Sequence, residues 1–126
     1  MSHLKQAYEF RNLMQQAVDC PCLSHAKLQG DLIDEECCEF ACALEEVKRN
    51  FFSSKRANEE CLKELADLVY VCYQFAASFG WDLDEALDRV HASNLSKLVD
   101  GKPLRREDGK VLKGPNYQPP SLIDLV

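Results

Sequence analysis

A chain of 126 residues is long enough for one domain, but it buries a smaller share of its surface than a larger protein would. The net charge of −6 and the pI near 5.0 exclude a nucleic-acid duplex as the expected partner, because phosphate contacts reward clustered Lys and Arg. No stretch has the apolar length of a bilayer span or the pattern of a signal peptide, so we expect a cytoplasmic protein that binds no membrane.

The spacing of apolar residues predicts four helices. The first spans about residues 4–18, with Ala17 and Val18 in its apolar stripe, and Cys20-Pro21-Cys22 breaks it. The second runs from about residue 24 to 47. The third covers about 57–79 and stops at Gly80, which takes a left-handed terminal conformation at little cost. The fourth opens with a capping box from Asp82 to Glu85 and continues to about residue 98.

The last 25 or so residues have no helical period and contain four of the five prolines. Asp108-Gly109 predicts a small hairpin turn between residues 104–106 and 111–113. We therefore expect an all-α fold of four helices, with a helical domain at residues 1–101. Residues 102–126 are expected to form an irregular tail that packs on this domain or on a neighbouring subunit. Association with further copies of the chain is expected, since they would cover a lean core.

Carboxylates sit inside the apolar sectors of the second and third predicted helices. At about 100° per residue, Glu36 and Glu64 each project at roughly 140°, among residues such as Leu65, and Glu39 and Asp67 follow one turn later. A buried carboxylate is costly unless it is paired or bound to a metal. Because all four donors are hard oxygens and no histidine joins them, the pattern predicts a site for Mg²⁺, with Mn²⁺ as the alternative.

Several other polar residues are candidates for roles beside such a metal. Glu35 projects at the edge of the sector, where it could hold a second ion or accept a proton from water. A Mg²⁺ site suggests phosphate chemistry, because the ion neutralises a triphosphate and keeps open positions for phosphoryl oxygens. Asn94 and Lys97 fall in the apolar stripe of the fourth helix and could contact such a triphosphate, although capping and snorkelling fit their spacing equally well. Lys113 and the basic residues near it could close over the triphosphate, or could belong to a solvated tail.

The seven cysteines predict reduced thiols, because their number is odd and no export signal is present. Cys20-Pro21-Cys22 and Cys37-Cys38 lack the paired C-x-x-C spacing of a structural zinc site. We expect the thiols to act as small apolar side chains.

Glu35-Glu36-x-x-Glu39 followed by Glu64-x-x-Asp67 resembles the E-E-x-x-E … E-x-x-D signature of the MazG-like all-α nucleoside triphosphate pyrophosphohydrolases. Residues 90–97 and 108–117 resemble later segments of that superfamily. The resemblance implies a Mg²⁺-dependent enzyme that hydrolyses a (deoxy)nucleoside triphosphate to monophosphate and pyrophosphate, in house-cleaning of the nucleotide pool. It further implies that Glu36, Glu39, Glu64 and Asp67 ligate metal, that Glu35 supports a further ion or the attacking water, and that Asn94 and Lys97 contact substrate. The resemblance also implies that residues 1–101 are the catalytic domain and that the protein forms a homodimer or homotetramer.

Two alternatives stay open at this point. One is a phosphoribosyl-ATP pyrophosphohydrolase of the same superfamily, since the acidic motif does not select a base. The other is a non-catalytic helical module whose acids bind a structural cation or a basic partner.

Overall fold

The computed structural model describes residues 1–126 and contains four α-helices, one short 3-10 helix and no β-strand. The elements are α1 (His3–Leu13), α2 (Leu23–Arg49), α3 (Lys55–Phe79), α4 (Leu83–Leu95) and η1 (Ile123–Leu125). The expected all-α fold is confirmed. No helix combines the length and the apolar character needed to cross a membrane.

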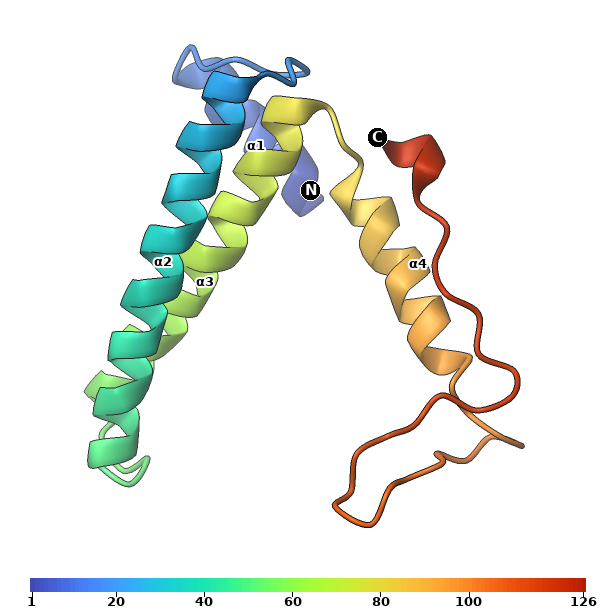
Figure 1. Ribbon diagram of the computed structural model, residues 1–126. Helices are drawn as coiled ribbons and strands as arrows, with labels where there is room; N and C mark the ends of the chain where they lie inside the picture. Colours follow the sequence, from blue (N-terminus) through green and yellow to red (C-terminus); the bar gives the residue numbers. More distant parts are fainter. The chain divides into compact units, whose positions relative to one another are not determined.

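The chain gathers into two compact units, Met1–Trp81 and Asp82–Val126. In the first unit, α2 and α3 run side by side in opposite directions and α1 packs against α3 (Figure 1). Ser54 starts α3 as its N-cap by accepting a hydrogen bond from the Ala57 backbone N–H. Because α2 and α3 are antiparallel, the middle of one lies against the middle of the other. The expected division into residues 1–101 and a tail stays a prediction.

The first helix is shorter than its apolar pattern predicts, and the placement of Ala17 and Val18 on it is wrong. It ends at Leu13, and Gln15 takes a positive φ of 56°, which takes the chain out of the helical conformation. The Arg11 guanidinium stabilises this exit, since its Nε donates to the Ala17 carbonyl oxygen at 2.7 Å. A side-chain contact with the backbone beyond the helix end thus overrides the helical spacing of apolar residues.

The segment after α1 is tied to the end of α3. The Asp19 N–H donates to the Ala77 carbonyl at 3.1 Å, and the Cys20 N–H donates to the Ser78 carbonyl at 2.8 Å. Gly80 ends α3 with a φ of 78°, as the sequence predicts. A Cβ at Gly80 would lie 3.3 Å from the Asp19 Cα, so the close approach of the two segments also requires glycine.

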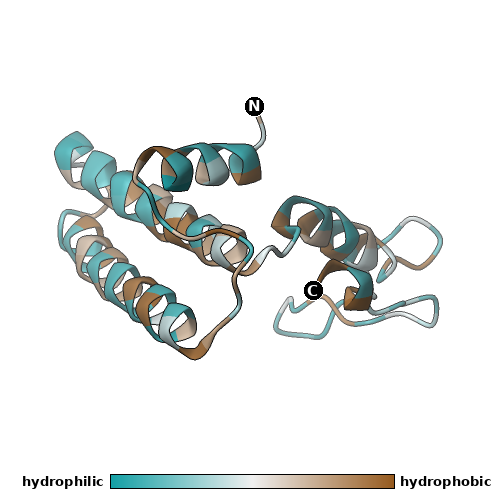
Figure 2. Ribbon diagram, turned by 90° about the horizontal axis from the view of Figure 1, so that it is seen from above, coloured by the Kyte–Doolittle hydropathy of each residue, from teal (hydrophilic) through white to brown (hydrophobic).

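The core of the first unit is small. Its buried apolar residues are mostly alanines, with one valine and one tyrosine: Ala7, Val47, Ala57, Tyr73, Ala76 and Ala77. Leu65, which the helical projection places in the apolar sector of α3, is 42% exposed, because α1 and α2 cover only part of that helix. Hydrophobic and hydrophilic residues alternate along the helices (Figure 2).

In the second unit, the predicted cap of α4 is confirmed, since the Asp82 carboxylate accepts from the Glu85 N–H at 3.0 Å. The expected hairpin turn is present as an isolated bridge between Arg105 and Val111, too short to count as strands. The tail folds back on α4 through Ser93, whose hydroxyl donates to the Gln118 carbonyl at 2.7 Å. Arg89 also holds it with a bidentate pair to Asp124 at 2.6 and 2.9 Å.

Candidate functional site

Three of the four predicted metal-binding carboxylates converge on one point between α2 and α3. Glu36 comes from α2, and Glu64 and Asp67 come from α3, where a separation of three residues puts both on one face. Each supplies one carboxylate oxygen, and these oxygens all lie within 4.8 Å of one another. Antiparallel packing of two helices that carry the same acidic spacing therefore produces a compact group of oxygen donors.

The two glutamates of this group are partly or fully shielded from water and incompletely paired, whereas the Asp67 side chain is 42% exposed. Glu64 is only 7% exposed, and the Oε2 atoms of Glu36 and Glu64 are buried without a hydrogen-bond partner. Burial raises the pKa of the Glu36 carboxyl above its ordinary value, and the negative charges of Asp67 and Glu64 raise it further. The group thus carries more negative charge than its surroundings compensate.

Glu39 lies at the exposed edge of this group. Repulsion from Glu36, followed by repulsion from Glu64, raises the pKa of the Glu39 carboxyl above its ordinary value. Glu35 is exposed and lies outside the converging oxygens, although its charge also raises the pKa of Glu36 and of Glu39.

One lysine partly offsets the charge. Lys63 Nζ lies 3.1 Å from Glu64 Oε1 and 3.0 Å from Asp67 Oδ2, and these hydrogen bonds, chiefly the one with Asp67, raise the pKa of the ammonium. It forms no ion pair with Glu36. Because the donors are all oxygens and two of those oxygens are buried and unpaired, the group fits a divalent cation of the Mg²⁺ type.

The predicted substrate contacts Asn94, Lys97 and Lys113 all belong to the second unit, and their roles stay predictions. Asn94 and Lys113 are exposed, and Lys97 is half-buried. Lys97 and Lys113 lie near each other, because Gly114, the residue after Lys113, packs closely against the Lys97 backbone. A Cβ at Gly114 would stand 2.8 Å from the Lys97 carbonyl oxygen. Lys113 itself lies over the Tyr117 ring, 4.8 Å from its centroid.

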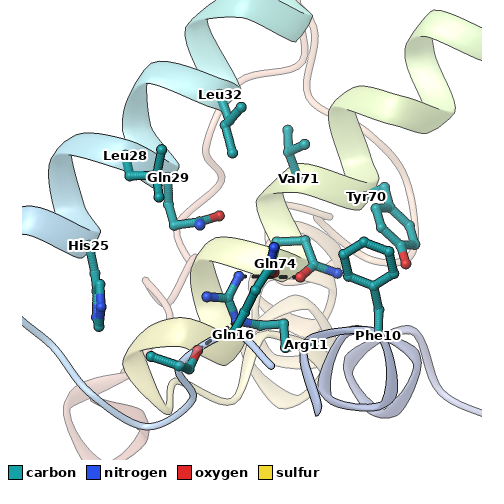
Figure 3. Close-up of a pocket in the computed structure, with 11 residues that line it drawn as sticks. Phe10, Arg11, Gln16, His25, Leu28, Gln29, Leu32, Tyr70, Val71 and Gln74 are labelled. Atoms are coloured by element: carbon teal, nitrogen blue, oxygen red, sulfur yellow. Dashed lines mark hydrogen bonds between the residues drawn. The ribbon is translucent and has the colours of Figure 1, made fainter. Parts of the chain in front are cut away.

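A cavity of about 570 Å³ opens between α1, α2 and α3 (Figure 3). Leu32 lines it one turn before Glu36 on α2, and Val71 lines it one turn after Asp67 on α3. At its other side stand the rings of Phe10 and Tyr70, edge to face with centroids 5.7 Å apart. The cavity therefore lies about one helical turn from the carboxylates, in the same unit of the chain.

Two glutamines give this cavity its polarity, and the sequence analysis did not find them. Gln29 is buried with an unpaired Oε1, and Gln74 is buried with an unpaired Nε2. Arg11 fixes the second amide, because its Nη1 can only donate and does so to Gln74 Oε1 at 3.3 Å. The two glutamines thus leave one buried acceptor, on Gln29, and one buried donor, on Gln74, without a partner. The two glutamines could have been found in the sequence by the criterion that identified the acids, namely a polar residue among the apolar positions of a helix.

An all-helical chain with paired carboxylates on two antiparallel helices defines a class, the MazG-like all-α pyrophosphohydrolases. The sequence profile of the family described as phosphoribosyl-ATP pyrophosphohydrolase matches residues 7–94. Since this is well over half of the chain, the protein belongs to that family. No individual curated protein matches it. The expected superfamily is therefore confirmed, and within it the match favours the phosphoribosyl-ATP alternative over house-cleaning.

Proposed function

We propose that the protein is a Mg²⁺-dependent pyrophosphohydrolase that cleaves the triphosphate of a nucleotide into a monophosphate and pyrophosphate. The observation that carries this proposal is the group of converging carboxylates on α2 and α3, with a nucleotide-sized cavity about one helical turn away. The family match supports the class of reaction.

Glu36, Glu64 and Asp67 would hold the cation, with Glu39 at its edge. Mg²⁺ bound there would neutralise phosphate oxygens and lower the pKa of an attacking water. Glu35 is exposed beside the group and is suited to accept the proton of that water. In the second unit, Asn94, Lys97 and Lys113 are proposed to contact the phosphates or the sugar.

The cavity would receive the nucleoside. Gln29 Oε1 and Gln74 Nε2 would pair with the polar edge of a base, which suits bases that carry a donor next to an acceptor. Phe10 and Tyr70 would border its ring. Because both amide atoms are buried and unpaired, a base that satisfies them would bind better than an apolar ring of the same size.

Phosphoribosyl-ATP is the first candidate substrate, and the family match supports it. A simple nucleoside triphosphate is the second candidate, and the cavity favours it. Phosphoribosyl-ATP carries a further ribose phosphate, which calls for a free cation. Arg11 is the cation lining the cavity, and it is buried and already bonded to Ala17 and Gln74.

The test is a direct comparison of substrates. Purified protein with Mg²⁺ is incubated with phosphoribosyl-ATP, with each dNTP and with each NTP, and pyrophosphate release is measured. We expect pyrophosphate and the matching monophosphate from at least one of them, and the highest kcat/KM identifies the substrate. A folded protein that releases no pyrophosphate from any of them would instead support the non-catalytic module.

A variant separates the roles of cavity and metal. Gln74→Ala removes the unpaired donor and is expected to raise KM about tenfold or more with little change in kcat, since one hydrogen bond of the ground state is lost. Gln6→Ala is the matched control, because Gln6 is an exposed glutamine of α1 that does not line this cavity. An unchanged KM in Gln74→Ala would remove the base from this cavity.

A further inference from the structure

We propose that Cys20, Cys22 and His25 form a second metal site, specific for Zn²⁺ and separate from the acidic group. One donor atom from each residue lies within 4.8 Å of the other two. Cys20 and Cys22 are exposed and His25 is half-buried, so the site is open to an ion from solution. The missing C-x-x-C spacing indicates thiols that act as small apolar side chains, but that spacing takes no account of His25, which lies close to Cys20 and Cys22 in the structure.

A hydrogen bond holds the His25 ring in place and leaves one ring nitrogen able to bind a metal. Its Nδ1 lies 2.7 Å from the Cys20 carbonyl oxygen. Because a carbonyl can only accept, Nδ1 carries the proton, and Nε2 of the neutral ring keeps its lone pair for a metal. A hydrogen bond from the second ring nitrogen to a backbone carbonyl is the common way in which proteins orient such a histidine. Here the carbonyl belongs to another proposed ligand.

The two cysteines are held in place by different elements. The Cys20 N–H donates to the Ser78 carbonyl at the end of α3, which fixes the segment to that helix. Cys22 is the N-cap residue of α2. Its Sγ lies at hydrogen-bonding distance, 3.3 Å, from the Ser24 hydroxyl oxygen. Both thiols are thus attached to ordered parts of the first unit.

The geometry and the donors select zinc. Zn–S bonds of about 2.3 Å in a tetrahedron place two sulfurs about 3.8 Å apart, a modest contraction from the observed limit of 4.8 Å. Two thiolates and an imidazole are soft or borderline donors, whereas the carboxylates of the other group are hard. The two sites should therefore prefer different metal ions, Zn²⁺ at the thiolates and Mg²⁺ at the carboxylates. With three protein ligands, the zinc keeps a fourth position for water or for another small ligand.

Cobalt substitution gives the primary test. Reduced, metal-free protein is first saturated with Mg²⁺ and then titrated with Co²⁺, followed by absorption spectroscopy. We expect one equivalent to produce thiolate-to-cobalt charge-transfer bands in the near ultraviolet and intense visible bands of tetrahedral cobalt. Added Zn²⁺ should bleach both. Absence of the charge-transfer bands in folded protein would overturn the site, and a preference for Cu⁺ over Zn²⁺ would overturn the assignment to zinc.

Variants assign the ligands. Cys20→Ser, Cys22→Ser and His25→Ala should each weaken zinc binding by more than about 100-fold in competition with a chromophoric chelator, because loss of even an outer partner of a ligand costs about 10–100-fold. Cys38→Ser and Cys42→Ser, which change exposed thiols outside the cluster, should leave the affinity unchanged. Glu64→Gln should also leave it unchanged. Wild-type zinc affinity in the Cys22→Ser or His25→Ala protein would overturn the proposal.

Discussion

At the scale of single residues, the decisive feature is the pair of buried carboxylate oxygens on Glu36 and Glu64 that accept no hydrogen bond. A buried charged group without a partner costs more than an ordinary lost hydrogen bond. The metal-free protein carries this cost, and Lys63 offsets it only for Glu64 and Asp67. A divalent cation would remove the cost, so metal binding and fold stability should be coupled.

Glu64→Gln tests this coupling. The amide keeps the shape of the side chain but removes a charge that faces the cation, so the rise of Tm with added Mg²⁺ should disappear and pyrophosphate release should fall about 100-fold or more. Differential scanning calorimetry with and without Mg²⁺ measures the first effect. Glu59→Gln is the control, because Glu59 is an exposed acid on the same helix outside the group. A variant that keeps both effects would contradict a metal role for Glu64.

Glu36→Gln tests the raised pKa. Glu36 holds its proton more tightly in the fold than in the unfolded chain, so metal-free protein loses stability as the pH rises from the ordinary value of 4.5 through the raised pKa. The variant lacks this loss. Its free energy of unfolding relative to wild type, measured by urea denaturation in EDTA, should grow across this window. A difference that is constant or falls with pH would show that Glu36 is not destabilised by its surroundings.

At the scale of elements, the end of α3 joins several parts of the first unit. Gly80 ends the helix in the left-handed region, and the segment of Asp19 and Cys20 is bonded to the last turn. The same segment carries the proposed zinc ligands Cys20 and Cys22. The conformation of one glycine therefore supports both the docking of this segment and the placement of the site.

Gly80→Ala should destabilise the protein by about 1–2 kcal/mol, because a residue with a Cβ is strained at a φ of 78° and the new atom would also crowd Asp19. Gly30→Ala is a control of opposite sign. Gly30 lies inside α2 with no heavy atom within 4 Å of the added Cβ, so alanine should stabilise by about 0.5–1 kcal/mol. Urea denaturation of both variants measures the two changes. A Gly80→Ala protein as stable as wild type would contradict the strain.

The sequence predicts the elements well where the local signal is strong. The end of α3 at Gly80 and the cap of α4 at Asp82 are confirmed, because both depend on single residues with distinct conformational or hydrogen-bonding properties. The end of α1 could not be predicted in this way. It depends on Gln15 in a positive-φ conformation and on the bond of Arg11 to Ala17, which the apolar period does not encode.

The acidic group could be inferred for a related reason. Carboxylates three apart on each of two helices need only antiparallel packing to meet, and three of the four do so at one point. Gln29 and Gln74 lie far apart in the sequence and share no motif, so their presence in one cavity follows only from the packing of α2 against α3. The roles of Asn94, Lys97 and Lys113 stay predictions.

At the scale of the whole molecule, the first unit leaves apolar surface uncovered. On α3, Leu62 is 67% exposed and Val69 is 47% exposed, and both line a hollow of about 410 Å³ with Leu65. The core behind them consists largely of alanines, which contribute little apolar area each. A stable monomer seldom keeps such a patch in water. This supports the prediction of a homodimer or homotetramer, with a second copy covering this face of α3.

Leu65→Lys combined with Val69→Lys tests the assembly. Two charges on this face would have to be buried in the interface, so the double variant should sediment as a monomer at concentrations where wild type sediments as an oligomer. Sedimentation velocity measures the difference, and circular dichroism checks that the helices persist. Leu13→Lys, at a residue 73% exposed at the end of α1, should keep the wild-type oligomer. A monomeric wild type, or a double variant that still assembles, would contradict this interface, since the exposed leucines and valine would then be tolerated in water.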